Sequence, residues 1–268
     1  MSPVRRLGQH FLTDRNILQR IVDALEPAPD DVVVEIGAGT GTLTAVLAPR
    51  VQSVIAIEKD RRLVAGMRAS GRVTVVEGDA LRLDWHALVS EATHPASRIP
   101  HPAFKVIGNI PYAITSPLID KALTPPLPAR IVFLVQAEVA DRISAVPGSK
   151  AYGALSVGVQ AVCRAEKLFT VRPGAFTPPP SVTSALVRLT PLADPVVAPA
   201  ELAAFRVFVT ACFTRRRKQL RNVVMAATGR SAAVVHDGLV ALALDPAARP
   251  ETLAPPAFAG LLRWNARL

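Results

Sequence analysis

Residues 32–41 read Val32-Val33-Val34-Glu35-Ile36-Gly37-Ala38-Gly39-Thr40-Gly41, a short apolar run that ends in a glycine-rich turn. The apolar run has the length and composition of a buried β-strand. Glycines allow the backbone to turn tightly at the end of such a strand and to approach a ligand without a Cβ in the way. The stretch therefore predicts a strand followed by a nucleotide-type turn. Taken alone, this turn is a weak signal, and a dinucleotide site is the obvious alternative to any other nucleotide-type ligand.

The alternation of apolar strand and helix continues on both sides of this turn. A helical pattern over residues 17–25 precedes it, with a cap expected at Thr13 or Asp14. Four further strands are expected after it, at Val54–Ile57, Val73–Val76, Phe104–Ile107 and Ile131–Val135. Short apolar strands separated by helices predict a parallel sheet that is covered on both faces, which is a doubly wound α/β domain.

The pattern changes after Gln136. Two extended stretches, Glu166–Val171 and Ala185–Leu189, follow a helix at Ala137–Ala145 and are joined by a loop rather than by a helix. Such stretches are typical of antiparallel strands, which we expect to close the sheet. The Pro- and Ala-rich residues 191–199 are the best linker candidate, and the sequence beyond them is helical. We therefore predict an α/β domain at residues 1–192 and a small helical domain at residues 199–268.

Composition excludes several classes of protein. Half of the 268 residues are hydrophobic, which excludes global disorder. The apolar runs are too short to cross a bilayer, and the residues after Met1 lack the apolar core of a signal peptide. Cys163 and Cys212 stand alone in apolar surroundings, so we expect core residues rather than a disulfide or a zinc site. A cytoplasmic protein without a metal is the resulting expectation.

The two halves of the chain carry different charge. Residues 1–150 hold 17 Lys and Arg against 15 Asp and Glu, whereas residues 151–268 hold 14 against 6. A basic half beside a nearly neutral half is typical of a polyanion-binding module joined to a small-molecule domain. The densest cations are Arg215, Arg216, Arg217, Lys218 and Arg221, which we expect on a helix. Phosphate contacts are the favoured interpretation of this run, and a solvated helix face is the alternative.

Carboxylates follow two of the expected strands. Glu58 ends the second strand, where it can accept hydrogen bonds from both hydroxyls of a ribose, and Asp79 follows the third, where it can accept from an adenine amino group. An acid after the second strand suits NAD and S-adenosylmethionine alike, whereas the second acid favours S-adenosylmethionine. Singly, each acid is better explained as a solvated carboxylate at a strand end; jointly, in this order, the two acids favour a methyl-donor site.

The fourth strand leads into Asn109-Ile110-Pro111-Tyr112. Proline removes an amide donor and holds the preceding residue in an extended conformation, so that carbonyls can point into a cavity. An adenine amino nitrogen is a poor nucleophile because its lone pair is delocalised into the ring. The amide oxygen of Asn109 and a main-chain carbonyl, expected to be that of Ile110, can accept its two protons and localise the lone pair. Tyr112 and Phe176 can hold the base at about 1–3 kcal/mol per stack, although Phe176 alone is explained equally well as a core residue.

Over nearly its whole length the chain resembles the ribosomal RNA adenine N6,N6-dimethyltransferases of the KsgA type. The resemblance is carried by the glycine turn, Glu58, Gly8-Gln-His-Phe-Leu12, Gly78-Asp79-Ala80, Gly108-Asn-Ile-Pro-Tyr112, Lys150-Ala-Tyr-Gly153, Ala175-Phe-Thr-Pro-Pro-Pro180 and Arg216-Arg-Lys-Gln-Leu-Arg-Asn222. It implies the Rossmann-like fold of class I S-adenosylmethionine-dependent methyltransferases, with a small all-helical C-terminal domain. Ala113 and Ser181 depart from the family, which often has Asn and Lys there, and His10 stands where other members have Asn.

The resemblance also implies a reaction: dimethylation of N6 of two adjacent adenosines in a hairpin loop near the 3′ end of small-subunit rRNA, with S-adenosylmethionine as the donor. It implies that the cofactor is contacted by His10, Leu12, Gly37, Glu58, Asp79 and Asn109. It implies that Asn109, Tyr112 and Phe176 form the adenine pocket. The partners are then the small ribosomal subunit and its rRNA, and we expect a monomer that needs no membrane.

Two alternatives stay open. The large-subunit (23S) rRNA dimethyltransferases that confer macrolide resistance share the catalytic motifs, but the matches at residues 150–153 and 216–222 fit the small-subunit enzymes better. A non-catalytic ribosome-assembly factor of the same fold is the other alternative. The intact Asp79, Asn109 and Tyr112 speak against it.

Overall fold

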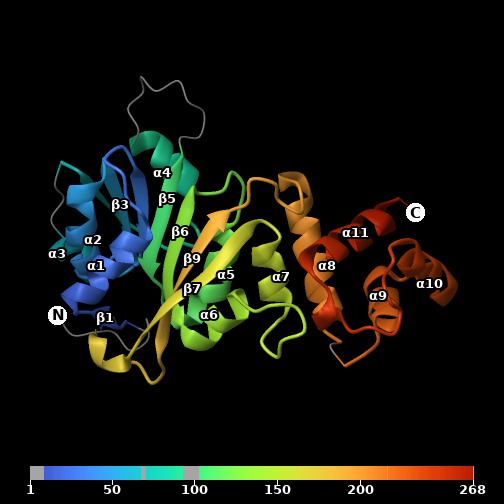
Figure 1. The fold of residues 1–268 in the computed structure, drawn as a ribbon. Coiled ribbons are helices and arrows are strands. Elements are labelled where there is room, and N and C mark those ends of the chain that lie inside the picture. Colours follow the sequence, from blue (N-terminus) through green and yellow to red (C-terminus); the bar gives the residue numbers. More distant parts are fainter. Residues whose placement is uncertain (1–8, 68–70, 93–102, 216, 268) are drawn as a thin grey trace. The chain divides into compact units, whose positions relative to one another are not determined.

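A computed structural model describes residues 9–67, 71–92, 103–215 and 217–267 of the chain. The chain divides into two compact units (Figure 1): unit 1 comprises residues 1–140 and 166–191, and unit 2 comprises residues 141–165 and 192–268. The change near residue 191 coincides with the expected linker, but residues 141–165 group with unit 2. The predicted pair of domains, 1–192 and 199–268, therefore differs from these compact units and stays a prediction.

Unit 1 is built on a sheet of seven strands in the order β4-β3-β2-β5-β6-β9-β7. The strands are β2 (Val32–Ile36), β3 (Ser53–Glu58), β4 (Val73–Glu77), β5 (Phe104–Asn109), β6 (Arg130–Gln136), β7 (Cys163–Val171) and β9 (Ser184–Pro191). The pairs from β4 to β6 are parallel, and β9 runs antiparallel to β6. This arrangement confirms the predicted α/β fold and its antiparallel closure.

Helices connect these strands. They are α1 (Arg15–Ala24), α2 (Thr42–Leu47), α3 (Arg61–Gly66), α4 (Trp85–Ala92), α5 (Thr115–Ala122) and α6 (Ala137–Ile143), with short 3-10 turns η2 (Ala48–Arg50), η3 (Tyr112–Ile114) and η4 (Pro173–Ala175). A separate two-stranded sheet pairs β1 (Phe11–Leu12) with β8 (Phe176–Thr177). Asp14 caps α1 as predicted, because its side chain accepts from the amides of Asn16 and Ile17.

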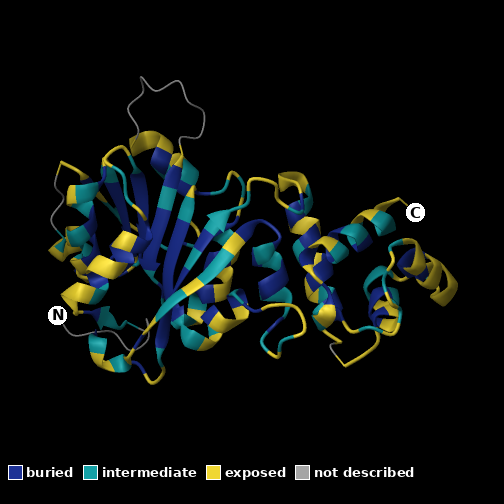
Figure 2. Ribbon diagram, in the orientation of Figure 1, coloured by how far each residue is buried: buried dark blue, intermediate teal, exposed yellow. Residues whose placement is uncertain are grey.

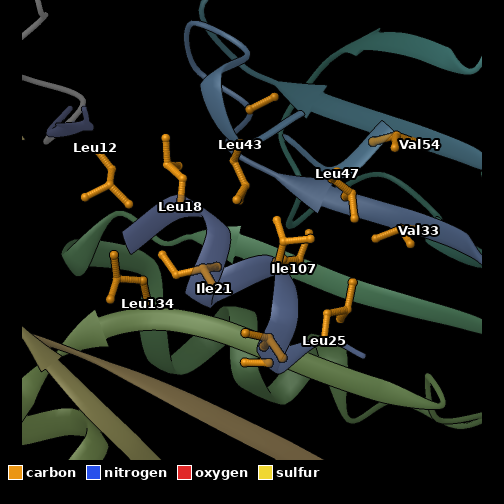
Figure 3. Close-up of a cluster of buried hydrophobic side chains, with 14 of the residues drawn as sticks. Leu12, Leu18, Ile21, Leu25, Val33, Leu43, Leu47, Val54, Ile107 and Leu134 are labelled. Atoms are coloured by element: carbon orange, nitrogen blue, oxygen red, sulfur yellow. The ribbon is translucent and has the colours of Figure 1, made fainter. Parts of the chain in front are cut away.

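Most residues of the central strands of unit 1 are buried (Figure 2). On one face, α1 and α2 pack on the strands; Figure 3 labels the cluster, which includes Leu18, Ile21, Leu25, Leu43, Leu47, Val33, Val54, Ile107 and Leu134. Neighbouring strand residues such as Val34, Ile55 and Phe133 are also buried. Successive strand side chains point to opposite faces, so burial of both explains why these strands appear as unbroken apolar runs.

Unit 2 is mainly helical. It contains α7 (Ala154–Gln160), α8 (Leu202–Phe213), α9 (Leu220–Thr228), α10 (Ala232–Ala241) and α11 (Pro255–Ala266), with 3-10 turns η5 (Pro199–Glu201) and η6 (Pro250–Thr252). Its core includes the fully buried Tyr152, Phe205 and Phe258. The hydroxyl of Tyr152 donates to the carbonyl of Leu253 at 2.9 Å, so the buried ring keeps a hydrogen bond.

Three negative observations apply to the described residues alone. None of their helices is both long and apolar enough to cross a membrane. They contain no group of three or more His, Cys, Asp and Glu side chains that could hold a metal ion. Cys163 and Cys212 are buried, as predicted for core residues. Both thiols are free, and burial raises the pKa of each to about 12.

Candidate active site

A cavity of about 520 Å³ opens in unit 1 at the carboxyl ends of β2, β3, β4 and β5. In open α/β sheets, ligands bind at this edge, where the strand order reverses, here between β2 and β5. The cavity is lined by all six residues predicted to contact a cofactor: His10, Leu12, Gly37, Glu58, Asp79 and Asn109. The structure therefore brings together residues that lie up to 99 positions apart in the sequence.

The glycine turn forms one wall as backbone. Gly37, Gly39 and Gly41 have φ angles of +69°, +60° and +78°, which side chains other than glycine rarely adopt. The amides of Gly37 and Ala38 donate to the carbonyl of Ile57 at 2.9 and 3.2 Å and fix the turn to β3. A Cβ at Gly39 would lie 3.2 Å from the ring of Phe11. The turn therefore has little room for side chains and leaves its main chain accessible to a ligand in the cavity.

Glu58 lies at the end of β3 and is 7% exposed. Its Oε2 accepts from the amide of Gly39 and its Oε1 from the amide of Asp60, both at 2.8 Å. Each carboxylate oxygen has a second lone pair, so the group can still accept from a ligand that enters the cavity. Two main-chain donors fix its orientation, as a carboxylate that recognises a pair of hydroxyls requires.

Asp79 follows β4 and forms an ion pair that the sequence did not predict. Its Oδ2 accepts from Nζ of Lys59 at 2.9 Å, and its Oδ1 from the amide of Leu81 at 3.0 Å. The hydrogen bond from Lys59 holds the pKa of Asp79 below its usual value, and partial burial opposes this effect. Lys59 itself lines the cavity. The position of Lys59 directly after Glu58 in the sequence was the signal from which a lysine in the cavity could have been predicted.

Asn109, at the end of β5, is held by the N-terminal segment. Its Nδ2 donates to the main-chain carbonyl of His10 at 2.8 Å. A carbonyl only accepts, so this bond assigns the two ends of the amide and leaves Oδ1 as the acceptor for a ligand. No donor among the described residues is bonded to that Oδ1. The amide of Ile110 donates to the carbonyl of Leu134 at 3.0 Å, which fixes the following loop to β6.

Tyr112 lines the same cavity, and its hydroxyl is 2.8 Å from Oγ of Ser184 on β9. Burial raises the pKa of Tyr112, and the hydrogen bond with Ser184 opposes that rise. The imidazole of His10 stacks on the phenol ring with centroids 5.9 Å apart and an interplanar angle of 28°. Ser184 was not predicted as a site residue, because it is 72 positions from Tyr112 in the sequence and no local pattern links the two.

Phe176 is not among the residues that line the cavity. It is 4% exposed and belongs to the hydrophobic cluster that also contains Leu12, its partner in the β1–β8 pair. This burial agrees with the alternative that the sequence left open, in which Phe176 is a core residue. A stacking role for Phe176 on a target base stays a prediction.

The N-terminal segment 9–12 is tied across the cavity at several points. Nε2 of Gln9 donates to Oδ2 of Asp60 at 3.1 Å, and the hydroxyl of Thr42 donates to the carbonyl of Leu12 at 3.4 Å. Nδ1 of His10 lies 2.9 Å from the carbonyl of Pro178 and must carry the proton there, because a carbonyl only accepts. These bonds hold the main-chain carbonyl of His10 in the position where it accepts from Nδ2 of Asn109.

Glu35 also lines the cavity, although no role was predicted for it. The residue is 1% exposed, and its Oε2 accepts from the hydroxyl of Thr44 at 2.6 Å. Burial raises the pKa of Glu35 to about 7; the negative charge of Glu58 adds to this rise and the hydrogen bond from Thr44 opposes it. A carboxyl group at the cavity wall therefore titrates near neutral pH.

The basic segment, residues 215–221, lies in unit 2. Arg215, Arg217, Lys218 and Arg221 are exposed, and Arg216 lies outside the described residues. The prediction of a helix there was wrong for most of the run, because α8 ends at Phe213 and α9 begins only at Leu220. Consecutive cations place like charges three positions apart, which a helix would hold close together.

Comparisons with known proteins agree with this geometry. A sequence model of the family described as ribosomal RNA adenine dimethylase matches residues 3–242. The chain is 40% identical to the ribosomal RNA small subunit methyltransferase A of Hahella chejuensis, over 95% of this chain and 89% of the relative. It is 42% identical to the protein of the same name from Bordetella bronchiseptica, over 96% of this chain and 92% of the relative.

Two solved structures are similar over nearly the whole chain. A dimethyladenosine transferase from Plasmodium falciparum has a TM-score of 0.81 and 27% identity, and the match covers 96% of this chain and 98% of that one. The 23S rRNA methyltransferase ErmE has a TM-score of 0.71 and 27% identity, with 96% and 99% covered.

Proposed function

Because the chain belongs to the ribosomal RNA adenine dimethylase family, we propose that it transfers methyl groups from S-adenosylmethionine to N6 of adenosines in small-subunit rRNA. The proposed product is N6,N6-dimethyladenosine at two adjacent positions in the 3′-terminal hairpin loop of 16S rRNA. The reaction would form part of small-subunit maturation, with the particle as the partner of a monomeric enzyme.

The cavity residues fit this cofactor. Glu58, fixed by two amides at 2.8 Å, is the proposed acceptor for the ribose hydroxyls, and Asp79 is the proposed acceptor for the adenine amino group. The glycine turn lets the remaining part of the ligand lie against main chain. When bound, S-adenosylmethionine supplies a methyl group on a positively charged sulfur. No metal or covalent nucleophile is required of the protein for such a transfer.

The observation that carries the proposal is the hydrogen bond from Nδ2 of Asn109 to the His10 carbonyl. It presents Oδ1 as an acceptor at the cavity, where it can take one proton of the target amine. The carbonyl of Ile110 is the proposed second acceptor. Together they would localise the nitrogen lone pair, and positioning of the amine beside the methyl group would supply most of the remaining rate enhancement.

Tyr112 supplies the aromatic surface of the proposed adenine pocket. Its ring is held on one side by Ser184 and is stacked by His10 on a face, so it is ordered before a base arrives. Stacking on Tyr112 would stabilise an unstacked base by about 1–3 kcal/mol. Phe176 could contribute a second ring only if its side chain leaves the hydrophobic cluster.

The basic segment in unit 2 is the proposed contact to rRNA phosphates. Arg215, Arg217, Lys218 and Arg221 are exposed, which such contacts require. The identity of about 40% to curated small-subunit enzymes supports the small subunit as substrate over the large subunit. The likeness to ErmE, at 27% identity, keeps the large-subunit rRNA as the second candidate.

The test is to map N6-dimethyladenosine on both rRNAs from cells that lack this protein. We expect the two small-subunit adenosines to lose their methyl groups and to regain them when the wild-type chain is supplied, but not when Asn109→Ala is supplied. Loss of methylation on large-subunit rRNA would favour the second candidate. Unchanged methylation of both rRNAs, together with no binding of S-adenosylmethionine in calorimetry, would favour a non-catalytic assembly factor.

A further inference from the structure

Glu35 is a buried carboxyl group that forms no ion pair with a described residue. It lies in β2, next to β3 and β5, and is 1% exposed at the wall of the cavity. Among the described residues its donors are both neutral and both belong to Thr44: the hydroxyl, at 2.6 Å, and the main-chain amide. Buried ionised carboxylates are normally paired with a cation, so the ionised form of Glu35 lacks a partner of opposite charge until a cationic ligand enters the cavity.

The other charged groups of the cavity do not neutralise it. Asp79 and Lys59 form an ion pair with each other at 2.9 Å. Glu58, which faces Glu35 from β3, is bonded to two main-chain amides and adds a negative charge. His10 uses Nδ1 for the carbonyl of Pro178. The described lining therefore carries two carboxyl groups, those of Glu35 and Glu58, in excess of its one lysine.

Given the function proposed above, this excess of negative charge acts differently on the methyl donor and on the product that remains after transfer. Transfer breaks the bond between carbon and the positively charged sulfur and forms a bond between carbon and nitrogen. Sulfur keeps the electron pair and becomes a neutral thioether, while the amine gives up a proton to solvent. S-Adenosylmethionine thus carries one more positive charge than its product, S-adenosylhomocysteine, and the two ligands are otherwise nearly alike.

We propose that Glu35 makes the cavity selective for the sulfonium donor over the thioether product, by losing a proton when the donor binds and regaining one from solvent when the positive charge has gone. Burial and the charge of Glu58 hold the pKa of Glu35 at about 7, so both protonation states are accessible near neutral pH. The ionised state attracts the sulfonium, whereas the protonated state is preferred beside the neutral product. Glu35 is a specificity residue for the cofactor in this account and takes no part in bond formation.

The expected size of the effect follows from Coulomb's law. Two unit charges about 8 Å apart at an effective dielectric of about 20 attract strongly enough to change a dissociation constant more than tenfold. Between pH 6 and pH 8 the carboxyl changes from mostly protonated to mostly ionised. We therefore expect S-adenosylmethionine to bind about tenfold more tightly at pH 8 than at pH 6, and S-adenosylhomocysteine to change less than about threefold.

Calorimetry on the full-length protein tests this directly. Titrations with each ligand at pH 6, 7 and 8, in buffers of different ionisation enthalpy, give both the affinity and the number of protons exchanged. At pH 7 we expect release of roughly half a proton from wild-type protein on binding of S-adenosylmethionine, and clearly less with the product. Protons that come from the ligand itself are the same in every variant and cancel in the comparison.

Three variants separate charge from structure. Glu35→Gln keeps the side-chain shape and can still accept from Thr44; it should reduce the preference for the donor about tenfold at pH 8 and abolish the extra proton release. Thr44→Val keeps the carboxyl but removes the bond that lowers its pKa, so the pH midpoint should move upward. Asp31→Asn is the control: Asp31 is partly buried, forms an ion pair with Lys105 at 2.6 Å, lies outside the cavity lining, and should leave the pH dependence unchanged.

The outcomes for Glu35 and for the proposed function are distinct. If wild-type protein binds both ligands with the same pH dependence and the same proton release, or if Glu35→Gln behaves as wild type, the role of Glu35 is refuted while the methyltransferase proposal stands. If Glu35→Gln does not fold, the midpoint shift in Thr44→Val decides. Failure of wild-type protein to bind either ligand would contradict the proposed function and, with it, this inference.

Discussion

The carboxylates in the cavity of unit 1 are held by hydrogen bonds, whereas the exposed cations of the basic segment in unit 2 form no ion pair with a described residue. Glu58 accepts from two main-chain amides, and Asp79 accepts from Lys59. A small ligand of fixed shape is recognised by groups whose orientation is set in advance. A polyanion can be held by mobile, solvated cations, because each phosphate contact contributes mainly through its charge and through release of counterions. The two regions should therefore respond to mutation in different ways, the first steeply and the second gradually.

Asn109→Ala should show the steepest response. Removing Oδ1 should lower the methylation rate at least about a hundredfold, comparable to the loss of one oxyanion-hole donor, because the lone pair of the amine is no longer localised. Affinity for S-adenosylmethionine should be largely spared. Single-turnover methylation of small-subunit particles measures the first effect and calorimetry the second. A variant with near wild-type rate would show that another group orients the amine.

Asp79→Ala should weaken cofactor binding while the fold stays intact. A charged acceptor for the adenine amino group contributes roughly 1.5–3 kcal/mol, which is about 10- to 150-fold in the dissociation constant. Asp30→Ala removes an exposed carboxylate that does not line the cavity and serves as the control. Equal affinity of the two variants for S-adenosylmethionine would remove Asp79 from the site.

Replacing Arg217 and Lys218 with Ala should produce a moderate and salt-dependent effect. Each lost phosphate contact should reduce the salt slope of binding to small-subunit particles by about one unit, on the scale of duplex DNA, with unchanged affinity for S-adenosylmethionine. Arg249 and Arg263 are matched control cations, because each is already paired with a glutamate. An unaltered slope in the Arg217/Lys218 variant would make the segment a solvated surface.

The smallest effect is expected at Ser184. Loss of its hydrogen bond to Tyr112 should cost about 0.5–1.5 kcal/mol, seen as a rise of up to about tenfold in the KM for rRNA with unchanged cofactor affinity. Tyr112→Phe removes the same bond from the other side, so the double variant should cost less than the sum of the two single changes. Additive costs would show that the bond does not position the ring.

Local pattern predicted unit 1 well because its elements are short and regular. The apolar runs at residues 32–36 and 131–135 lie within β2 and β6, and Asp14 caps α1 as expected. The prediction of a helix was wrong for Arg215, Arg217 and Lys218. Helical propensity continues past Phe213 in the sequence, but α8 ends at that residue. Residues 141–165 are the other difference: in sequence they lead into the strand β7 and include its first three residues, yet they group with unit 2 through contacts that no local pattern encodes.

The sequence by itself determined the order of strands and helices, the glycine turn, and the acids and amide that end successive strands, because each of these depends on residues close together in the chain. Only the tertiary structure decided how those groups are set. The His10 carbonyl orients Asn109 across 99 residues, and Lys59 neutralises Asp79. Phe176 is buried in the core, and among the described residues Glu35 is left with the neutral donors of Thr44 beside the negative charge of Glu58. Hydrogen-bond partners, burial and the ionisation of a carboxyl group all depend on segments that meet only when the sheet has formed, which is why a linear pattern could name the residues but not their chemical state.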